Sequence, residues 1–246
     1  MRIQPRAEQR HGYELPARLL HWLAALAIFA ALGLGLWMTR LPAETEAEVT
    51  TVFRAYSAHK TIGIAALALG MARILWAILR PGPGPLHPER VVETFLARLT
   101  HRLLWIGLLA LPATGLLYHS AAPGFAPILW PFGQALPFVP ADEALALAFR
   151  NLHEAAGWLV MAALALHIAG TMKHVAIDQD ATLARMTTGT GPSVPPTRRA
   201  ILTAVLALAL WAAALTASWL TAPQPEPDPF DVLDGLETFD DLDRPE

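Results

Sequence analysis

Between residues 151 and 170 the chain reads NLHEAAGWLVMAALALHIAG, an apolar run that holds two histidines, His153 and His167. A hydrocarbon core about 30 Å thick needs about 20 apolar residues in a helix, so this run predicts a membrane span. Histidine is costly in such a span and usually faces the interior of a bundle for a functional reason. His167 follows His153 by fourteen positions. This spacing returns the second nearly to the face of the first, about 21 Å further along the helix. One helix therefore offers a ligand near each membrane surface.

Four further stretches of the chain are long and apolar enough to cross a bilayer, and segments rich in proline, glycine and charge separate them. The expected spans are residues 16–38, 58–79, 99–118, 152–175 and 200–222. The composition agrees, because 54% of the residues are hydrophobic and 16% are charged, whereas globular soluble domains have about 25% charged residues. The sequence therefore predicts an all-α integral membrane helix bundle, with a four-helix core and a fifth transmembrane helix.

The chain divides into three expected parts. Residues 1–186 form a four-helix transmembrane domain, residues 187–222 form a linker and the fifth transmembrane helix, and residues 223–246 form an acidic tail. The tail carries nine acidic residues against one basic residue, Arg244. The chain has no cysteine, which excludes disulfides and thiolate-bound iron–sulfur clusters. Any metal or cofactor must be held by histidine, methionine, carboxylate or main chain.

Lysine and arginine set the predicted orientation, because cytoplasmic loops carry an excess of these residues. One side of the predicted bundle has Arg2, Arg6, Arg10, Arg18, Arg80, Arg90, Arg98, Arg102, Lys173, Arg185, Arg198 and Arg199. The other side has only Arg40, Arg54, Lys60, Arg150 and Arg244. The N-terminus is therefore expected in the cytoplasm and the acidic tail on the outer side.

Two more histidines join His153 and His167 once this topology is considered. His21 lies early in the first span, on the cytoplasmic side, and His59 starts the second span on the outer side. The fourth span enters from outside, so His153 is expected at the outer level and His167 at the inner level. We call His59 and His153 the outer pair, and His21 and His167 the inner pair. Two bis-histidine sites suit two b-type haems, because imidazole is an established iron ligand and bundles bind cofactors between facing helices.

Small residues near the histidines support this placement. Gly63 and Gly157 each follow an outer histidine by four residues, and Gly170 follows His167 by three. Residues one turn apart share a helix face, and glycine leaves that face without a side chain. We expect a flat macrocycle to approach the backbone at these positions.

Two arginines are candidates to bind an anion beside the inner pair. Arg73 follows His59 by fourteen residues, hence on nearly the same face but at the inner level, and Arg18 precedes His21 by one turn. A buried arginine requires a negative partner, and a haem propionate would supply one. The alternative for Arg73 is that its long side chain reaches the inner interface.

Other features leave alternatives open. A membrane histidine can simply hydrogen-bond a neighbouring helix. His101, at the inner end of the third span, is an interfacial hydrogen-bonding residue, a rival inner ligand or a proton-handling residue near a quinone. The outer connection over residues 120–150 is apolar and aromatic, so it is either a cap on the bundle or a floor for a lipid-soluble substrate. The candidate quinone contacts near it are Lys60, His119, Trp130 and Arg150.

Several short motifs, taken in their order and spacing, resemble the bacterial cytochrome b561 family. They are Arg18-Leu-Leu-His21-Trp22; His59-Lys60-x-x-Gly63 leading to Arg73; Ala110-Leu-Pro112-x-x-Gly115; Trp130-x-x-Gly133 with Leu136-Pro137; His153-Glu154 with His167; and Lys173-His174-x-x-Ile177-Asp178-x-Asp180-x-Thr182-Leu183. The resemblance covers about residues 13–186, and the fifth span and the acidic tail extend beyond it.

The family resemblance implies a four-helix bundle with two haem b groups in the bacterial inner membrane, ligated by His21, His59, His153 and His167. Such proteins are related to the cytochrome b subunits of hydrogenases. They carry electrons between the quinone pool and a periplasmic partner, and some oxidise superoxide and reduce ubiquinone. The expected partners are therefore membrane lipid, a ubiquinone-type quinone and a periplasmic redox partner, with no nucleic acid.

Three functions follow in order of preference. The first is a di-haem membrane cytochrome that transfers electrons between the quinone pool and a periplasmic donor or acceptor, superoxide included. The second is a membrane-anchor cytochrome b subunit of a larger oxidoreductase. The third is a non-haem transporter that uses the histidines as proton relays, which the sequence supports poorly because no span contains paired acidic residues.

Overall fold

The computed structural model describes residues 12–122, 126–192, 194–195 and 201–225. Its regular elements are the helices α1 (Leu15–Met38), α2 (Glu46–Leu79), α3 (Val91–Ala121), α4 (Glu143–Lys173), the short π-helix η1 (His174–Asp178), α5 (Thr182–Thr187) and α6 (Ile201–Leu220). Within the described residues, five helical segments are long and apolar enough to cross a membrane: α1, α2, α3, α4 with η1, and α6. The predicted all-α membrane bundle is confirmed. Most of the predicted acidic tail, from residue 226 onward, lies outside the described residues.

Three of the long helices begin earlier than the sequence predicts. α2 begins at residue 46 instead of 58 because Thr45 and Glu48 form a capping box, in which each side chain accepts a hydrogen bond from the other residue's backbone N–H, at 3.3 Å and 3.0 Å. α4 begins at residue 143 instead of 152, where Asp142 Oδ1 accepts from the Leu145 N–H at 2.8 Å. α3 begins at Val91 instead of residue 99. The predicted bounds were too short because they followed the thickness of the hydrocarbon core. Capping side chains start α2 and α4 earlier, whereas Arg90 makes no side-chain cap at α3.

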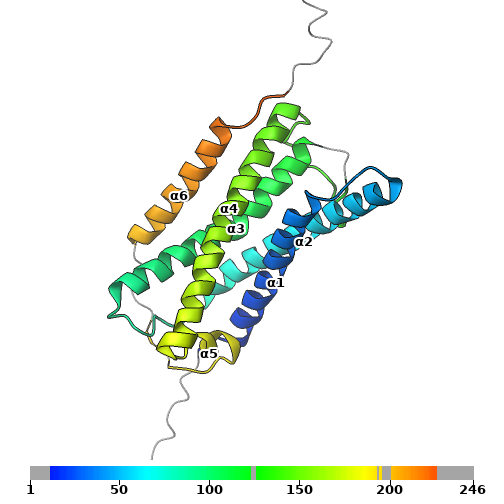
Figure 1. Cartoon of the computed structure of the whole chain (residues 1–246). Helices are drawn as coiled ribbons and strands as arrows, with labels where there is room; N and C mark the ends of the chain where they lie inside the picture. The colour runs from blue at the N-terminus through cyan, green and yellow to red at the C-terminus, as the bar shows by residue number, and fades with distance from the viewer. Residues whose placement is uncertain (1–11, 123–125, 193, 196–200, 226–246) are drawn as a thin grey trace, which may run out of the picture.

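Each of the first four helices packs against the next one along the chain. α1 lies against α2, α2 against α3 and α3 against α4, and the α3–α4 contact is the most extensive (Figure 1). α6 lies against α3 and α4, on the side away from α1 and α2. α1 and α4 do not pack on each other in this way, although both line the same cavity. The first four helices therefore surround an internal space.

The packed core lies between α3, α4 and α6, away from that space. Its buried residues are Leu103, Ala156, Val160, Ala163, Ala207 and Trp211. Small residues allow close helix approach, and a Cβ added at Gly107 would lie only 2.6 Å from Val160 Cγ2. Trp211 Nε1 donates a hydrogen bond to the Leu103 carbonyl at 3.1 Å. The fifth long helix, α6, thus packs directly against α3 and α4 of the four-helix core.

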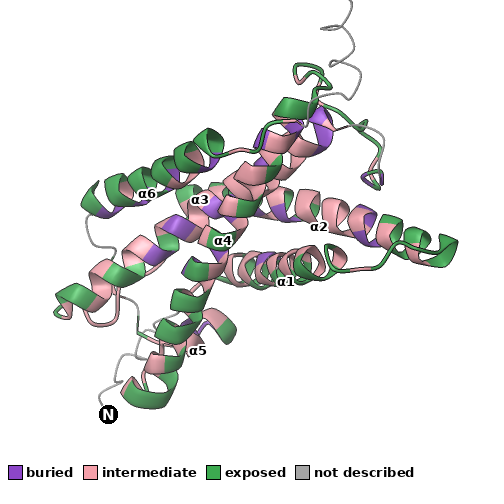
Figure 2. Cartoon of the chain, turned by 45° about the horizontal axis from the view of Figure 1, so that its top comes forward, coloured by how far each residue is buried: buried purple, intermediate pink, exposed green. Residues whose placement is uncertain are grey.

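The outward faces of the helices are apolar and exposed. Leu26, Ile78 and Leu202 expose 71%, 62% and 61% of their surfaces, and Figure 2 shows α6 exposed along much of its length. Apolar surface of this extent is unfavourable in water and is expected in lipid. These outward helix faces are therefore suited to contact with lipid, as the sequence predicts.

Candidate functional site

The outer pair brings together one imidazole from α2 and one from α4. The ring centroids of His59 and His153 lie 6.0 Å apart, with the ring planes at 85°. His59 Nδ1 lies 2.9 Å from the Ala31 carbonyl oxygen, and His153 Nδ1 lies 2.9 Å from the Leu111 carbonyl oxygen. A carbonyl only accepts hydrogen bonds, so each Nδ1 is the donor and each Nε2 keeps its lone pair for a metal.

The inner pair brings together imidazoles from α1 and α4. The centroids of His21 and His167 lie 6.2 Å apart, with the ring planes at 61°. His21 Nδ1 is buried and has no hydrogen-bond partner among the described residues. A third imidazole, His101 on α3, has its centroid 5.1 Å from that of His167. The structure therefore places three imidazoles at the inner level.

The ring separations fit a metal between the members of each pair. Two metal–nitrogen bonds of about 2 Å, together with the two rings, separate the centroids of a bis-imidazole pair by about 6 Å. The outer and inner pairs match this value at 6.0 Å and 6.2 Å. The separation of His101 and His167 is shorter, at 5.1 Å. The geometry favours His21 over His101 as the partner of His167.

One large cavity connects the two pairs. It has a volume of about 1280 Å³ and is lined by all four predicted ligand histidines, together with His101 and many apolar side chains of α1, α2, α3 and α4. Pockets for small molecules typically have volumes of about 300–1,000 Å³. This cavity is therefore large enough for a cofactor bigger than an ordinary small ligand.

Two of the predicted glycines border open space in this cavity. A Cβ added at Gly63 would meet no heavy atom within 4 Å, and one added at Gly157 would meet only Leu111 Cδ1, at 3.9 Å. Both residues line the cavity. A Cβ at Gly170 would also meet nothing within 4 Å, but Gly170 is not among the described residues that line the cavity. Gly63 and Gly157 thus fit the close approach of a flat group.

Two other glycines admit the histidine rings themselves. A Cβ added at Gly35 would lie 3.1 Å from His59 Cε1, and one added at Gly115 would lie 2.9 Å from His153 Cε1. The sequence analysis did not assign either glycine to the site. The sequence does carry a signal at both positions, because each glycine lies inside a predicted helix. Glycine there is unfavourable relative to alanine by about 0.5–1 kcal/mol, so its presence indicates a packing requirement.

The two predicted arginines occupy different surroundings. Arg73 lines the cavity, and its guanidinium carbon lies 5.2 Å from the centroid of the Trp105 ring. Among the described residues Arg73 has no ion-pair partner, so its charge is available to an anion in the cavity. Arg18 instead lies against Gly189, where an added Cβ would overlap its Nη1. Arg18 is not among the described residues that line the cavity.

Arg185 is a cavity residue that the sequence analysis did not single out. It is 5% exposed, lines the cavity and donates from Nη2 to the Gly84 carbonyl at 2.9 Å. Burial lowers the pKa of its guanidinium, and its Nε has no hydrogen-bond partner among the described residues. No spacing pattern indicated it, because it comes from the short helix α5 and not from a membrane span.

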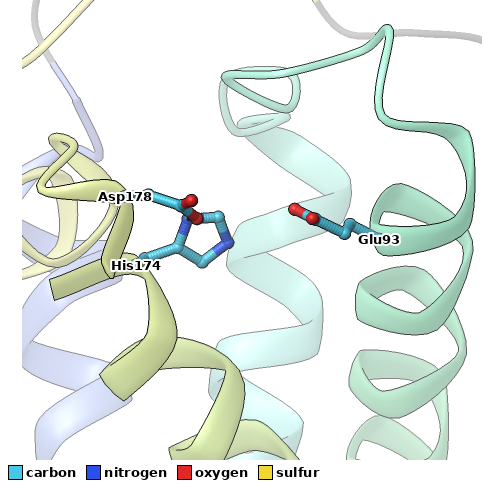
Figure 3. A group of neighbouring side chains, drawn as sticks. All are labelled: Glu93, His174 and Asp178. Atoms are coloured by element: carbon cyan, nitrogen blue, oxygen red, sulfur yellow. The ribbon is translucent and has the colours of Figure 1, made fainter. Parts of the chain in front are cut away.

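A charged cluster joins the start of α3 to the end of α4 and to η1, and Figure 3 shows three of its side chains. We call it the inner cap, and its residues are Arg90, Glu93, Lys173, His174 and Asp178. Glu93, His174 and Asp178 place ligand-type atoms within 4.8 Å of one another, as groups that hold a metal ion do. Lys173 Nζ, however, lies 2.9 Å from Glu93 Oε1 and 2.8 Å from Asp178 Oδ2. Arg90 Nη1 lies 2.9 Å from Asp178 Oδ1. Two side-chain cations thus neutralise both carboxylates, and we interpret the cluster as an ion-pair network.

Asp180 contacts His174 of the inner cap, and the pKa of its carboxyl group is low. Its Oδ2 lies 2.8 Å from His174 Nδ1 and 3.2 Å from His87 Nε2, and its Oδ1 accepts from the Thr182 N–H at 2.8 Å. Burial opposes ionisation of this carboxyl, but the hydrogen bonds from Thr182 and His174 outweigh burial and hold the pKa of Asp180 at about 2, below the ordinary value of 3.8.

The low pKa of Asp180 predicts a pH-dependent contribution to stability. A carboxyl group with a depressed folded-state pKa stabilises the fold above its unfolded-state pKa, and this contribution is lost as the pH falls through the folded value. Asp180→Asn should therefore lower the melting temperature near neutral pH, and its difference from wild type should shrink between about pH 4 and pH 2. Thermal unfolding of both proteins across this range checks the prediction, and a difference that stays constant with pH contradicts it.

Two of the four candidate quinone contacts, Lys60 and His119, lie beside each other. Lys60 Nζ lies 3.1 Å from His119 Nδ1 and donates to the Ala126 carbonyl at 2.9 Å, which fixes the outer loop. Trp130 Nε1 donates to the Gly133 carbonyl within that loop. Of the four contacts, only Arg150 is among the described residues that line the cavity. Hydrogen bonds tie the loop to α2, and both of its expected roles, a cap and a floor for a lipid-soluble substrate, stay predictions, as does the position of a quinone.

Comparison with known proteins agrees with the site. A family model described as prokaryotic cytochrome b561 matches residues 12–189. Cytochrome b561 homolog 2 of Escherichia coli (strain K12) is 30% identical over 175 residues, which cover 71% of this chain and 90% of the relative. Cytochrome b561 homolog 1 of the same organism is 26% identical over 172 residues, which cover 68% of this chain and 92% of the relative.

The matched region contains both histidine pairs and α1 to α5, whereas α6 follows it. Haem b is the prosthetic group of this family, and the imidazole pairs, open glycine positions and apolar cavity described above fit it. The chain therefore belongs to the prokaryotic cytochrome b561 family, the multi-pass bacterial membrane proteins that hold haem b and transfer electrons.

Proposed function

We propose that the chain holds two haem b groups and transfers electrons across the bacterial inner membrane, between the quinone pool and a periplasmic donor or acceptor. His59 and His153 ligate the outer haem, and His21 and His167 ligate the inner haem. One observation carries the proposal: two imidazole pairs, with centroids 6.0 Å and 6.2 Å apart, line a single apolar cavity in a membrane bundle.

Each group of residues has a defined task in this proposal. The histidines hold the iron atoms, and the carbonyls of Ala31 and Leu111 orient the outer rings. Gly63 and Gly157 leave room for flat macrocycles, and Arg73 presents a positive charge to a propionate. The apolar helix faces exclude water from the site. Haem b, when bound, supplies the one-electron chemistry of iron.

The spacing of the ligands suits transfer across the membrane. His153 and His167 are fourteen residues apart on α4, about 21 Å along the helix axis, and the hydrocarbon core is about 30 Å thick. The lysine and arginine distribution supports a cytoplasmic N-terminus and hence an outer pair on the periplasmic side. A periplasmic reductant as small as superoxide fits this scheme.

Haem stoichiometry and reduction kinetics of the purified chain in detergent test the proposal. We expect two haems per chain in the pyridine haemochrome assay and rapid reduction of the isolated protein by a quinol or by superoxide. One haem per chain would contradict the di-haem arrangement. Rapid reduction only after a second subunit is added would instead favour the membrane-anchor function. Inserted protein without haem absorbance would exclude both.

A further inference from the structure

The connection between α3 and α4 carries no charged side chain over residues 126–141, which we call the apolar loop. It does carry large apolar side chains that the described residues leave exposed. Leu129, Phe132 and Phe138 expose 66%, 80% and 74% of their surfaces, and none of them belongs to a helix. Exposed apolar surface of this kind indicates a contact with lipid or with another protein.

Hydrogen bonds give the apolar loop a defined shape. The Gln134 side chain accepts from the Ile128 N–H at 2.8 Å and donates to the Ile128 carbonyl at 3.0 Å. The Leu136 N–H donates to Ser120 Oγ at 3.1 Å. Ile128 itself is buried, with 3% of its surface exposed. The loop thus buries part of its apolar surface within the protein and holds the rest outward.

A hydrogen bond to α2 fixes the depth of the apolar loop, because the Leu129 N–H donates to Thr61 Oγ1 at 2.9 Å. Arg80 follows directly after Leu79, the last residue of α2. Charge is costly inside the bilayer, so this end of α2 marks one edge of the hydrocarbon core. Thr61 precedes Leu79 by 18 positions, about 27 Å along the helix axis. The core is about 30 Å thick, so the loop lies close to its opposite edge.

We infer that the apolar loop is an interfacial segment, which lies in the leaflet on the side of the outer pair. Leu129, Phe132 and Phe138 contact the lipid there. The inference goes beyond the proposed function, because it concerns the lipid contact of the protein and not its haems. Interfacial helices use phenylalanine and leucine in the same way, and these side chains enter the boundary of headgroups and acyl chains by about 5–10 Å. Since the loop has no charged residue, the contact does not depend on the charge of the headgroups.

Labels at single cysteines test the inference, because the chain has no cysteine of its own. The full chain is reconstituted in phosphatidylcholine vesicles, and a nitrobenzoxadiazole fluorophore is attached at Phe132→Cys. Two further labels calibrate the depth. Leu26→Cys lies on the outward face of α1 and is 71% exposed. Ala47→Cys is exposed in the first turn of α2, about 21 Å beyond Thr61 along the helix axis.

Three quenchers read the surroundings of each label: a lipid nitroxide near the headgroup, a lipid nitroxide near the end of the acyl chain, and iodide on both sides of the membrane. We expect the label at Phe132→Cys to lose more fluorescence to the shallow nitroxide than to the deep one or to iodide. The label at Leu26→Cys should respond most to the deep nitroxide, and the label at Ala47→Cys to iodide alone. Vesicles of phosphatidylglycerol should give the same pattern.

The outcomes that contradict the inference are distinct from one another. Quenching of the Phe132→Cys label by iodide alone would place the loop in water. Protection from all three quenchers would show that protein covers the loop, a second copy of the chain included. Shallow quenching that requires phosphatidylglycerol would overturn a contact independent of headgroup charge. Phe138→Cys repeats the measurement if the first variant does not accumulate, and none of these results depends on haem content.

Discussion

Alanine substitution of the four ligand histidines should remove haems pairwise. His59→Ala and His153→Ala should each lose the outer haem, whereas His21→Ala and His167→Ala should each lose the inner haem. The reason is that a single imidazole leaves one axial position of a bis-histidine haem without its ligand. Each variant should keep about half of the wild-type haem, because the other pair is intact. Haem per chain in the pyridine haemochrome assay and the redox titration of the remaining haem measure the effect.

His101→Ala is the matched control for this series. Its ring centroid lies 5.1 Å from that of His167, but it belongs to neither pair. We expect His101→Ala to keep both haems. Loss of the inner haem in His101→Ala, with retention in His21→Ala, would assign the ligand to α3 instead of α1. Stable variants of His21 and His59 that lose the same haem would contradict the pairing itself.

Gly115→Ala should weaken binding of the outer haem by about 10–100-fold, the range found when groups that orient metal ligands are altered. The added Cβ would lie 2.9 Å from His153 Cε1 and 3.1 Å from its Nδ1. The ring must rotate or α3 must move, and either change disturbs the 2.9 Å contact between His153 Nδ1 and the Leu111 carbonyl. Transfer of haem from the purified protein to excess apomyoglobin measures the loss.

Gly33→Ala provides the comparison for this substitution. Gly33 also lies inside a membrane-spanning helix, but a Cβ at this position would meet no heavy atom within 4 Å. We expect its haem transfer to follow wild type. If Gly115→Ala released its outer haem no faster than Gly33→Ala, the contact between Gly115 and His153 would not limit haem binding.

The grouping of the histidines was accessible from the sequence because it depends on chain order and helix geometry alone. The spacing of His153 and His167 on one helix fixes their two levels, and the alternating direction of the spans fixes which histidine shares each level. The structure brings the same residues together, at 6.0 Å and 6.2 Å between centroids. The all-helical bundle was accessible for the same reason.

Contacts between helices were not accessible in this way. Thr114 and Gly115 lie beside His153 only because α3 presents one particular face to α4, and the rotation of a helix about its axis follows from packing. Arg18 illustrates the same limit. Its spacing from His21 places both on one face of α1, but its guanidinium lies against Gly189, just after the end of α5. Nothing within α1 specifies that neighbour.

α6 packs against α3 and α4 and adds a fifth crossing to the bundle. The start of α1 and the end of α6 therefore face different compartments. α1 starts at one end of the bundle and α6 finishes at the other (Figure 1), as an odd number of crossings requires. A reporter protein fused behind α6 is therefore delivered to the compartment that the outer pair faces. The same reporter fused ahead of α1 stays in the opposite compartment, so the two fusions together read out the orientation of the molecule.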